Sequence, residues 1–342
     1  MQHHAVLTSD RLSACISLDF SNIGVDMGGR LYGLDALRGV AAIAVALHHF
    51  ARVNHLPLLP LNPAIAVDLF FILSGFVLTR TYEDRLRNGL TTVGFIGLRY
   101  RRLFLPLAIG STIGLALVIA FQGISGPLLA AYALILLFLP VVGRPAFPLN
   151  VPAWSLFVEI VCNVLHGVII SKISNLQVLV LAVAGALVFI ASFATGLSLW
   201  SPAFASVLWL IPRELTCYLV GVWMFRTYGD VPLGRYPLLA VIIFAVSLVL
   251  ASFSPAFEIG ALVACPFIVR ASLGLPRMGW AIWAGAISYP LYATHVPALQ
   301  AARAMGLQPL FAAMLVAALA IFITVAFETR RGGMKPAHQI SA

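Results

Sequence analysis

Eleven apolar stretches, each about long enough to cross a bilayer as an α-helix, follow one another along almost the whole chain. Such a span needs ~20 predominantly apolar residues, and the stretches lie at about 34–51, 64–79, 103–121, 126–142, 152–171, 176–194, 203–225, 237–253, 256–272, 280–301 and 309–328. Charged residues make up 10% of the chain, against about 25% in a soluble domain. Strand-like alternation is absent, and backbone groups in lipid must be paired within the segment. The sequence therefore predicts an all-α, polytopic integral membrane helical bundle.

These stretches leave no room for a folded domain outside the membrane, so we expect one transmembrane domain over residues 31–330. Residues 1–30 are interpreted as a polar N-terminal extension, and Met27 offers a second start, which leaves open whether residues 1–26 are translated. Residues 331–342 are expected to form a short cytoplasmic tail. The cysteines have no paired metal spacing, and three of the four lie in apolar stretches as expected for core packing. We expect no metal site.

The net charge of +9 does not indicate nucleic-acid binding, because the arginines collect at the ends of the apolar stretches. Such clusters mark the cytoplasmic side of a membrane protein. One cluster, within residues 80–102, follows the second stretch, and others follow the fifth, seventh, ninth and eleventh. All of them can be cytoplasmic only if one stretch between residues 103 and 171 fails to cross, as a re-entrant segment would. We therefore predict about ten crossings of a bacterial inner membrane with both termini in the cytoplasm; which stretch fails is left open.

Few ionisable side chains lie within the apolar stretches, and each is a candidate functional residue. A charge at the centre of a spanning helix costs about 2.5–3.5 kcal/mol on insertion scales. The candidates are Asp68, Glu159, Arg213, Glu214 and Glu258, with His49, His166 and His295 beside them. We expect the adjacent Arg213 and Glu214 to pair with each other, and Glu258 to be interfacial.

The first stretch carries Arg38 and His49 on one helical face. Residues eleven apart fall within about 20° of each other around a helix and roughly 16 Å apart along it, whereas His48 points about 100° away from His49. An extended anionic ligand could reach both side chains, with its charged end at Arg38. The alternative is that Arg38 reaches the interface while His49 pairs with a neighbouring helix.

Five segments in this order resemble the acyltransferase 3 family of membrane-bound O-acyltransferases. They read LDALRGVAAIAVALHHF, AVDLFFILSGFVLT, RYRRLFLP, NVPAWSLFVEI and ISYPLYATHVP, and the resemblance covers about residues 31–330. It implies transfer of an acetyl or other short acyl group from a cytoplasmic acyl-CoA, expected to be acetyl-CoA, to a hydroxyl of a carbohydrate or similar small acceptor.

The resemblance also assigns residues to roles. The LRG arginine of the family falls on Arg38, and its histidine falls on His49 rather than His48. The remaining family positions match Arg99, Arg102, Trp154, Ser155, Glu159, Ser288, Tyr289, Tyr292 and His295. Two departures are that Glu328 lacks a following proline and that His166 has no counterpart. Some members carry a further hydrolase-like domain, whose activity we would expect another protein to supply here.

Acyl transfer gives these residue types a chemical purpose. A base must take the hydroxyl proton and the polyphosphate donor must be held. We predict His49 as the base, oriented by Glu159 or, as second choice, by Asp68, with Arg38 contributing to catalysis and to donor binding. Arg99 and Arg102 are predicted as a partly exposed clamp for the CoA phosphates, unless they serve only as a topology signal.

Acceptor contacts are predicted for the remaining matched side chains. These are Trp154, Ser155, Ser288, Tyr289 and His295. The alternatives are an interfacial anchor for Trp154 and a structural hydrogen bond for His295. In the last motif, Pro290 and Pro297 are expected to interrupt their helix and to free carbonyls that line a cavity. Ser74 and Gly75 are expected to allow close helix packing.

Two other functions stay open. Many helices with buried charges also describe a secondary transporter or a flippase of a lipid-linked saccharide or small metabolite, although the two halves show no convincing repeat. A catalytically inactive relative that binds a lipid-linked sugar is the third interpretation. Membrane lipids are the other expected partner, and the sequence indicates neither the acceptor, nor the acyl length, nor the oligomeric state.

Overall fold

The computed structural model describes residues 29–142, 145–194 and 204–332, and this part of the chain contains helices and no strand. The helices are α2 (Tyr32–Val53), α3 (Pro63–Arg87), α4 (Thr92–Gln122), α5 (Gly126–Leu136), α6 (Ala153–Val168), η2 (Ile170–Lys172), α7 (Asn175–Ala194), α8 (Phe204–Tyr228), α9 (Pro237–Leu250), α10 (Pro255–Ser272), α11 (Gly279–Ala304) and α12 (Pro309–Gly332). The predicted all-α polytopic class is confirmed. Residues 1–28 and the tail from 333 onward lie outside the described residues.

Several helices begin at the capping signals that the sequence carries. Asn62 precedes Pro63, and its side chain accepts a hydrogen bond from the Ala64 amide at 2.9 Å. Thr91 and Ser254 do the same for α4 and α10. Such side chains satisfy amide groups that no helical carbonyl reaches, and proline suits the first turn because its missing N–H is not needed there.

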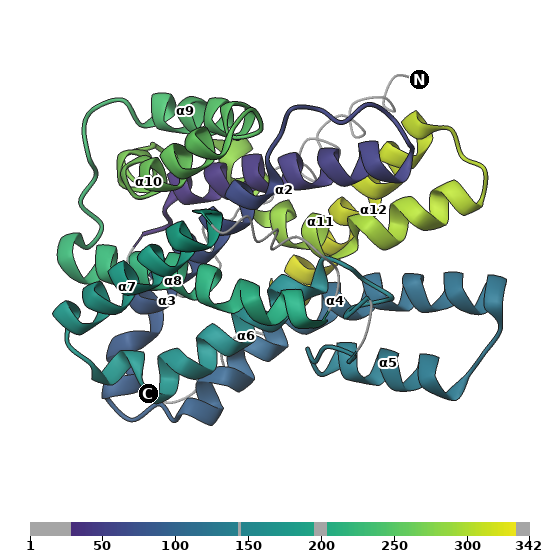
Figure 1. The fold of residues 1–342 in the computed structure, drawn as a ribbon, viewed down its shortest axis with the longest axis horizontal. Helices are drawn as coiled ribbons and strands as arrows, with labels where there is room; N and C mark the ends of the chain where they lie inside the picture. Colours follow the sequence, from purple (N-terminus) through teal and green to yellow (C-terminus); the bar gives the residue numbers. More distant parts are fainter. Residues whose placement is uncertain (1–28, 143–144, 195–203, 333–342) are drawn as a thin grey trace, which may run out of the picture.

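The helices form a bundle in which α2 and α11 lie side by side through the centre and α3 packs along α8 (Figure 1). At the second crossing, Gly75 faces the carbonyl of Tyr218 and Gly221 faces the carbonyl of Ile72, so closely that a Cβ at either position would overlap the facing backbone. The expected packing role of Gly75 is confirmed. This close contact holds α8 against the helix that carries Asp68.

Seven of the described helices are long and apolar enough to cross a membrane: α2, α3, α4, α6, α8, α10 and α12. The helix α5 has 11 residues, about 16 Å at 1.5 Å per residue, which is too short for a ~30 Å hydrocarbon layer. It turns back along α4 at one edge of the bundle (Figure 1). The short helix lies in the region where one stretch was predicted not to cross; the total of about ten crossings stays a prediction.

The two prolines of α11 do not interrupt it, since the helix is continuous from Gly279 to Ala304. A proline at position 297 leaves the carbonyl four residues earlier, that of Ala293, without its helical donor. The Asn150 side chain donates to this carbonyl at 2.9 Å. The expectation of an interrupted helix was therefore wrong, and the freed carbonyl at Ala293 docks the loop before α6.

Candidate active site

A narrow cavity of about 90 Å³ lies among α2, α3, α4, α6 and α11. We call it the arginine cavity, because three of its polar lining residues are arginines. The polar residues that line it are Arg38, Ser74, Arg99, Arg102, Ser155, Glu159, Ser288, Tyr289 and Tyr292. Arg99 and Arg102 are three residues apart on α4 and so share a face, whereas the intervening Arg101 is exposed and lies outside the lining. The three arginines predicted to bind the donor therefore line one cavity.

A second and larger cavity, of about 660 Å³, lies at the C-terminal half of α2. We call it the histidine cavity, because His48 and His49 line it. Its other polar and aromatic lining residues are Arg52, Asn62, Phe147, Trp154, Glu258, Tyr292 and Gln300. Both histidines of the adjacent pair line it, although they point in different directions from α2. Trp154 lies here, at the start of α6, while its neighbour Ser155 lines the arginine cavity.

The two cavities adjoin, and they share the lining residues Val67 and Tyr292. Tyr292 is nearly buried, and its hydroxyl lies 2.7 Å from that of Ser155. We call the two shared residues, Val67 and Tyr292, the partition. The arginines of α2 and α4 line the cavity on one side of it, and His49 lines the cavity on the other side.

His49 is hydrogen-bonded to His295 of α11. The Nδ1 atom of His295 lies 3.0 Å and 2.9 Å from the carbonyl oxygens of Leu291 and Tyr292. Since carbonyls only accept, this nitrogen carries the hydrogen of a neutral ring, and the Nε2 atom of His295 is an acceptor.

The hydrogen on the His49 ring can be assigned in the same way. Its Nδ1 atom lies 3.0 Å from the carbonyl oxygen of Val45 and 3.2 Å from His295 Nε2, so it faces two acceptors and must be the donor. A neutral His49 then has its free lone pair on Nε2. The pair therefore holds His49 in the tautomer that a base needs.

The carboxylates expected to orient His49 lie elsewhere. Glu159 accepts a hydrogen bond from Arg99, and Asp68 forms an ion pair with Arg213. The expectation of a carboxylate partner for His49 was therefore wrong for both residues. Each acidic side chain instead pairs with an arginine on a neighbouring helix. Burying a paired charge costs much less free energy of folding than burying an unpaired one.

Arg99 is not the partly exposed residue that the sequence suggested. Only 5% of it is exposed, and its charge is compensated by Glu159 at the wall of the arginine cavity. Arg102 is exposed. The paired arginine motif therefore contributes one buried ion pair and one cation accessible from outside.

A second buried charge cluster joins α3, α8 and α10. Arg213 donates to both oxygens of Asp68 at 2.8 Å and 2.6 Å, and to Glu258 at 3.0 Å. The pairing expected between Arg213 and Glu214 was wrong, because neighbouring residues point about 100° apart on a helix. Glu258, expected to be interfacial, lies in the first turn of α10 and belongs both to this network and to the lining of the histidine cavity.

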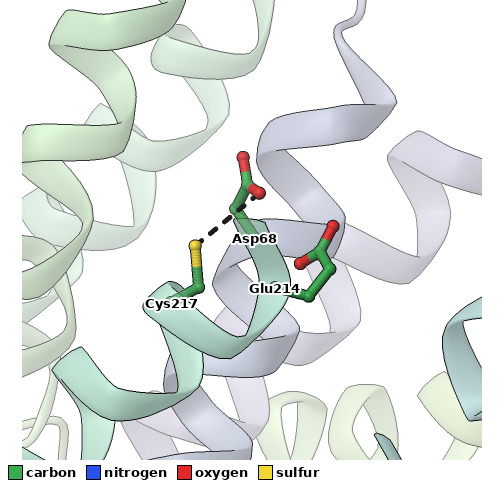
Figure 2. Close-up of side chains that lie close together, drawn as sticks. All are labelled: Asp68, Glu214 and Cys217. Atoms are coloured by element: carbon green, nitrogen blue, oxygen red, sulfur yellow. Dashed lines mark hydrogen bonds between the residues drawn. The ribbon is translucent and has the colours of Figure 1, made fainter. Parts of the chain in front are cut away.

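Figure 2 shows Asp68, Glu214 and Cys217 near one another in this cluster. Their ligating atoms lie within 4.8 Å of one another, and Cys217 donates to Asp68 at 3.7 Å. Both Asp68 oxygens already accept from Arg213. A cation of the chain itself thus compensates this carboxylate, and we interpret the cluster as an ionic lock between α3 and α8.

Sequence reasoning gave no separate role to Tyr292 or Arg52, which line the cavities. Tyr292 was matched only as part of its motif, because nothing in a single sequence shows which side of a helix faces two cavities. His166 lies outside both cavities and hydrogen-bonds with the Tyr218 hydroxyl at 2.9 Å.

Comparisons with known proteins agree with the helical architecture and the motif series. A family model described as an acyltransferase domain, that of acyltransferase family 3, matches residues 31–328. A protein named "Protein 2 in picA locus", from Rhizobium radiobacter, is 36% identical over 183 residues, which is 46% of this chain and 93% of that protein. No solved structure matches the chain. Since the family model covers nearly the whole helical bundle, the chain belongs to the acyltransferase 3 family and is a multi-pass membrane acyltransferase.

Proposed function

We propose that this acyltransferase moves an acetyl group, or another short acyl group, from acyl-CoA to a hydroxyl of a carbohydrate or similar acceptor. The observation that carries the proposal is the division of the site into two adjoining cavities. Three arginines line one, a histidine with a free lone pair lines the other, and a single partition separates them.

The arginine cavity is the proposed donor site. CoA carries phosphates, which guanidinium groups bind as forked, charge-assisted hydrogen bonds. Arg102 is exposed and suits the phosphates, while Arg38 and the Arg99–Glu159 pair lie along the narrow cavity. A volume of about 90 Å³ suits a short acyl chain and its thioester rather than a nucleotide.

The histidine cavity is the proposed acceptor site. Its volume of about 660 Å³ is within the ~300–1,000 Å³ of small-molecule sites. Trp154 offers an aromatic face, and Asn62, Glu258 and Gln300 offer hydrogen-bonding groups for a polyhydroxylated acceptor. Of the side chains predicted to contact the acceptor, Trp154 lines this cavity, whereas Ser155, Ser288 and Tyr289 line the arginine cavity. His295 is fully buried and lines neither cavity, so we propose that it acts through its hydrogen bond to His49.

His49 is the proposed general base. Its Nε2 takes the proton of the acceptor hydroxyl as the oxygen attacks the thioester carbon, and the imidazolium that forms shares its other hydrogen with His295 Nε2. When the carbon–sulfur bond breaks, His49 gives this proton to the leaving sulfur, which becomes the thiol of CoA. Histidine suits both steps because its pKa in water lies near neutrality.

The charge distribution supports a cytoplasmic donor side. The arginine cluster at residues 80–102 marks the cytoplasmic face by the positive-inside rule, and Arg99 and Arg102 of the donor cavity belong to it. We accordingly place both termini in the cytoplasm and the protein in a bacterial inner membrane, with the histidine cavity toward the opposite face.

A secondary transporter or flippase would also use two cavities that meet inside the membrane. The two functions differ in their products: an acyltransferase makes a new ester, and a transporter makes none. Mass spectrometry of envelope glycans and extracted metabolites should show acetyl-sized increments in the wild type that are missing in a deletion strain. Identical spectra with altered transport of a metabolite would favour the transporter.

A further inference from the structure

The division into two cavities limits where acyl transfer can take place. As proposed above, the thioester enters by the arginine cavity and the acceptor hydroxyl by the histidine cavity. The thioester carbon that the hydroxyl oxygen attacks must then lie where the two cavities adjoin. The side chains at this partition are therefore candidates for contact with the reacting atoms.

Two residues line both cavities, Val67 and Tyr292. Val67 carries no polar group. Tyr292 carries a hydroxyl, and this side chain is only 6% exposed. Among the described residues, Tyr292 thus supplies the polar side chain common to both cavities.

The hydrogen-bond partners of Tyr292 leave it able to donate. Its hydroxyl lies 2.7 Å from the Ser155 hydroxyl, which itself lies 3.1 Å from the carbonyl oxygen of Pro152. Because this carbonyl only accepts, the Ser155 hydrogen points to it and the Tyr292 hydrogen points to Ser155. When a stronger acceptor forms nearby, the Tyr292 hydrogen can rotate to it, and Ser155 can then donate to the phenolic oxygen.

We propose that Tyr292 is a catalytic residue whose hydroxyl donates a hydrogen bond to the oxyanion of the tetrahedral intermediate, with Ser155 as its positioning residue. The hydroxyl oxygen of the acceptor bonds to the thioester carbon, and the carbonyl electron pair moves to its oxygen, which becomes the oxyanion. The displaced proton goes to His49. The electron pair then re-forms the carbonyl, the carbon–sulfur bond breaks, and the leaving sulfur takes the proton from His49. Tyr292 keeps its own proton throughout.

Such a donor acts on charge that is present only in the transition state and the intermediate, so it changes kcat rather than the affinity for the donor. Removing one donor to an oxyanion lowers kcat by about 10²–10³-fold in well-studied enzymes. Tyr292→Phe should therefore lower kcat about a hundredfold or more, while the Kd for acetyl-CoA stays within about twofold. Ser155→Ala should lower kcat less, because Tyr292 keeps its own hydroxyl.

The test uses purified full-length chain, acetyl-CoA and an envelope extract from a deletion strain as the source of acceptor. Ester formation and thiol release are followed together, and acetyl-CoA binding is measured separately. The matched control is Tyr132→Phe, because the Tyr132 hydroxyl also lies 2.7 Å from another hydroxyl, that of Thr112, but outside both cavities. This variant should keep the wild-type kcat.

The outcomes separate this inference from the proposed function. No ester from wild-type protein would contradict the acyltransferase reaction proposed above. Given wild-type activity, a Tyr292→Phe variant with unchanged kcat overturns the role of Tyr292. A variant that loses acetyl-CoA affinity while kcat is retained also overturns it, because Tyr292 would then only shape the donor cavity.

Discussion

The ion pair between Asp68 and Arg213 should be among the interactions on which the stability of the bundle depends most. Asp68 is fully buried, Arg213 is 4% exposed, and two hydrogen bonds of 2.8 Å and 2.6 Å join them. Hydrogen bonds to charged groups contribute about 1.5–3 kcal/mol each, and removing one partner of a buried pair costs about 3–5 kcal/mol. Because Arg213 keeps Glu258 as a partner, we expect the lower end, about 3 kcal/mol, for Asp68→Asn.

A loss of this size lowers the ratio of folded to unfolded protein by roughly a hundredfold. The assay is thermal unfolding of the purified protein in detergent, in which Asp68→Asn should lower the Tm by several degrees. The control is Asp230→Asn. Its partner Arg80 also donates to both carboxylate oxygens, at 2.9 Å each, but Asp230 is 42% exposed, and exposed pairs contribute about 0–1 kcal/mol.

The triple variant Asp68→Leu, Arg213→Met and Glu258→Gln should recover part of the lost stability, since it removes the buried pair together with the carboxylate that Arg213 also binds and leaves none of these three charges unpaired. If Asp68→Asn unfolds within 1 °C of Asp230→Asn, the buried pair is not the ionic lock that we describe. The same conclusion would follow if the triple variant were less stable than Asp68→Asn.

Three further predictions concern the site and its orientation. Arg102→Gln should raise the Kd for acetyl-CoA about tenfold through loss of one charge-assisted contact, and the wild-type affinity should fall as salt rises, as titration calorimetry can measure. His295→Ala should lower kcat about tenfold or more with little change in KM, because His49 loses one of the two acceptors of its Nδ1 hydrogen and keeps only the Val45 carbonyl; steady-state kinetics separate the two. In intact cells, a membrane-impermeant thiol reagent should label a new cysteine at Leu58 and leave one at Arg87 unlabelled.

Each of these has its own control. Arg101→Gln removes an exposed cation from the same helix without touching the arginine cavity, so equal losses of affinity would show a general charge effect. His166→Ala removes another fully buried histidine outside both cavities; a similar fall in kcat would mean that His295 acts through stability alone. Labelling of a cysteine at Arg87 from outside the cell would show that the protein has the opposite orientation in the membrane.

The spanning helices could be predicted because each one depends on local composition. Stretches of about twenty apolar residues, capping residues such as Asn62 before Pro63, and the small Gly75 all act within one helix or at one crossing. A short helix at α5 could not be predicted, because the charge pattern places a non-crossing stretch only somewhere between residues 103 and 171, and the stretch at about 126–142 contains no charged residue that would mark an early end.

Partners across helices could not be derived in the same way. Helical periodicity placed Arg38 and His49 on one face, and both line the adjoining cavities. The choice of Glu159 or Asp68 as the partner of His49 failed, because the depth and rotation of each helix decide which charges meet. His295 was available as a candidate from its motif, but its contact with His49 depends on how α2 packs against α11.

Transfer of an acyl group from acyl-CoA to a hydroxyl is proposed to depend on His49 as the base. Its most direct test is to incubate inverted membrane vesicles with radiolabelled acetyl-CoA and to measure alkali-labile label in lipid and glycan fractions. Vesicles with the wild-type chain should accumulate ester-linked label, and vesicles with equal amounts of folded His49→Ala should not. Absence of label with the wild type, or equal label with both, would contradict the account.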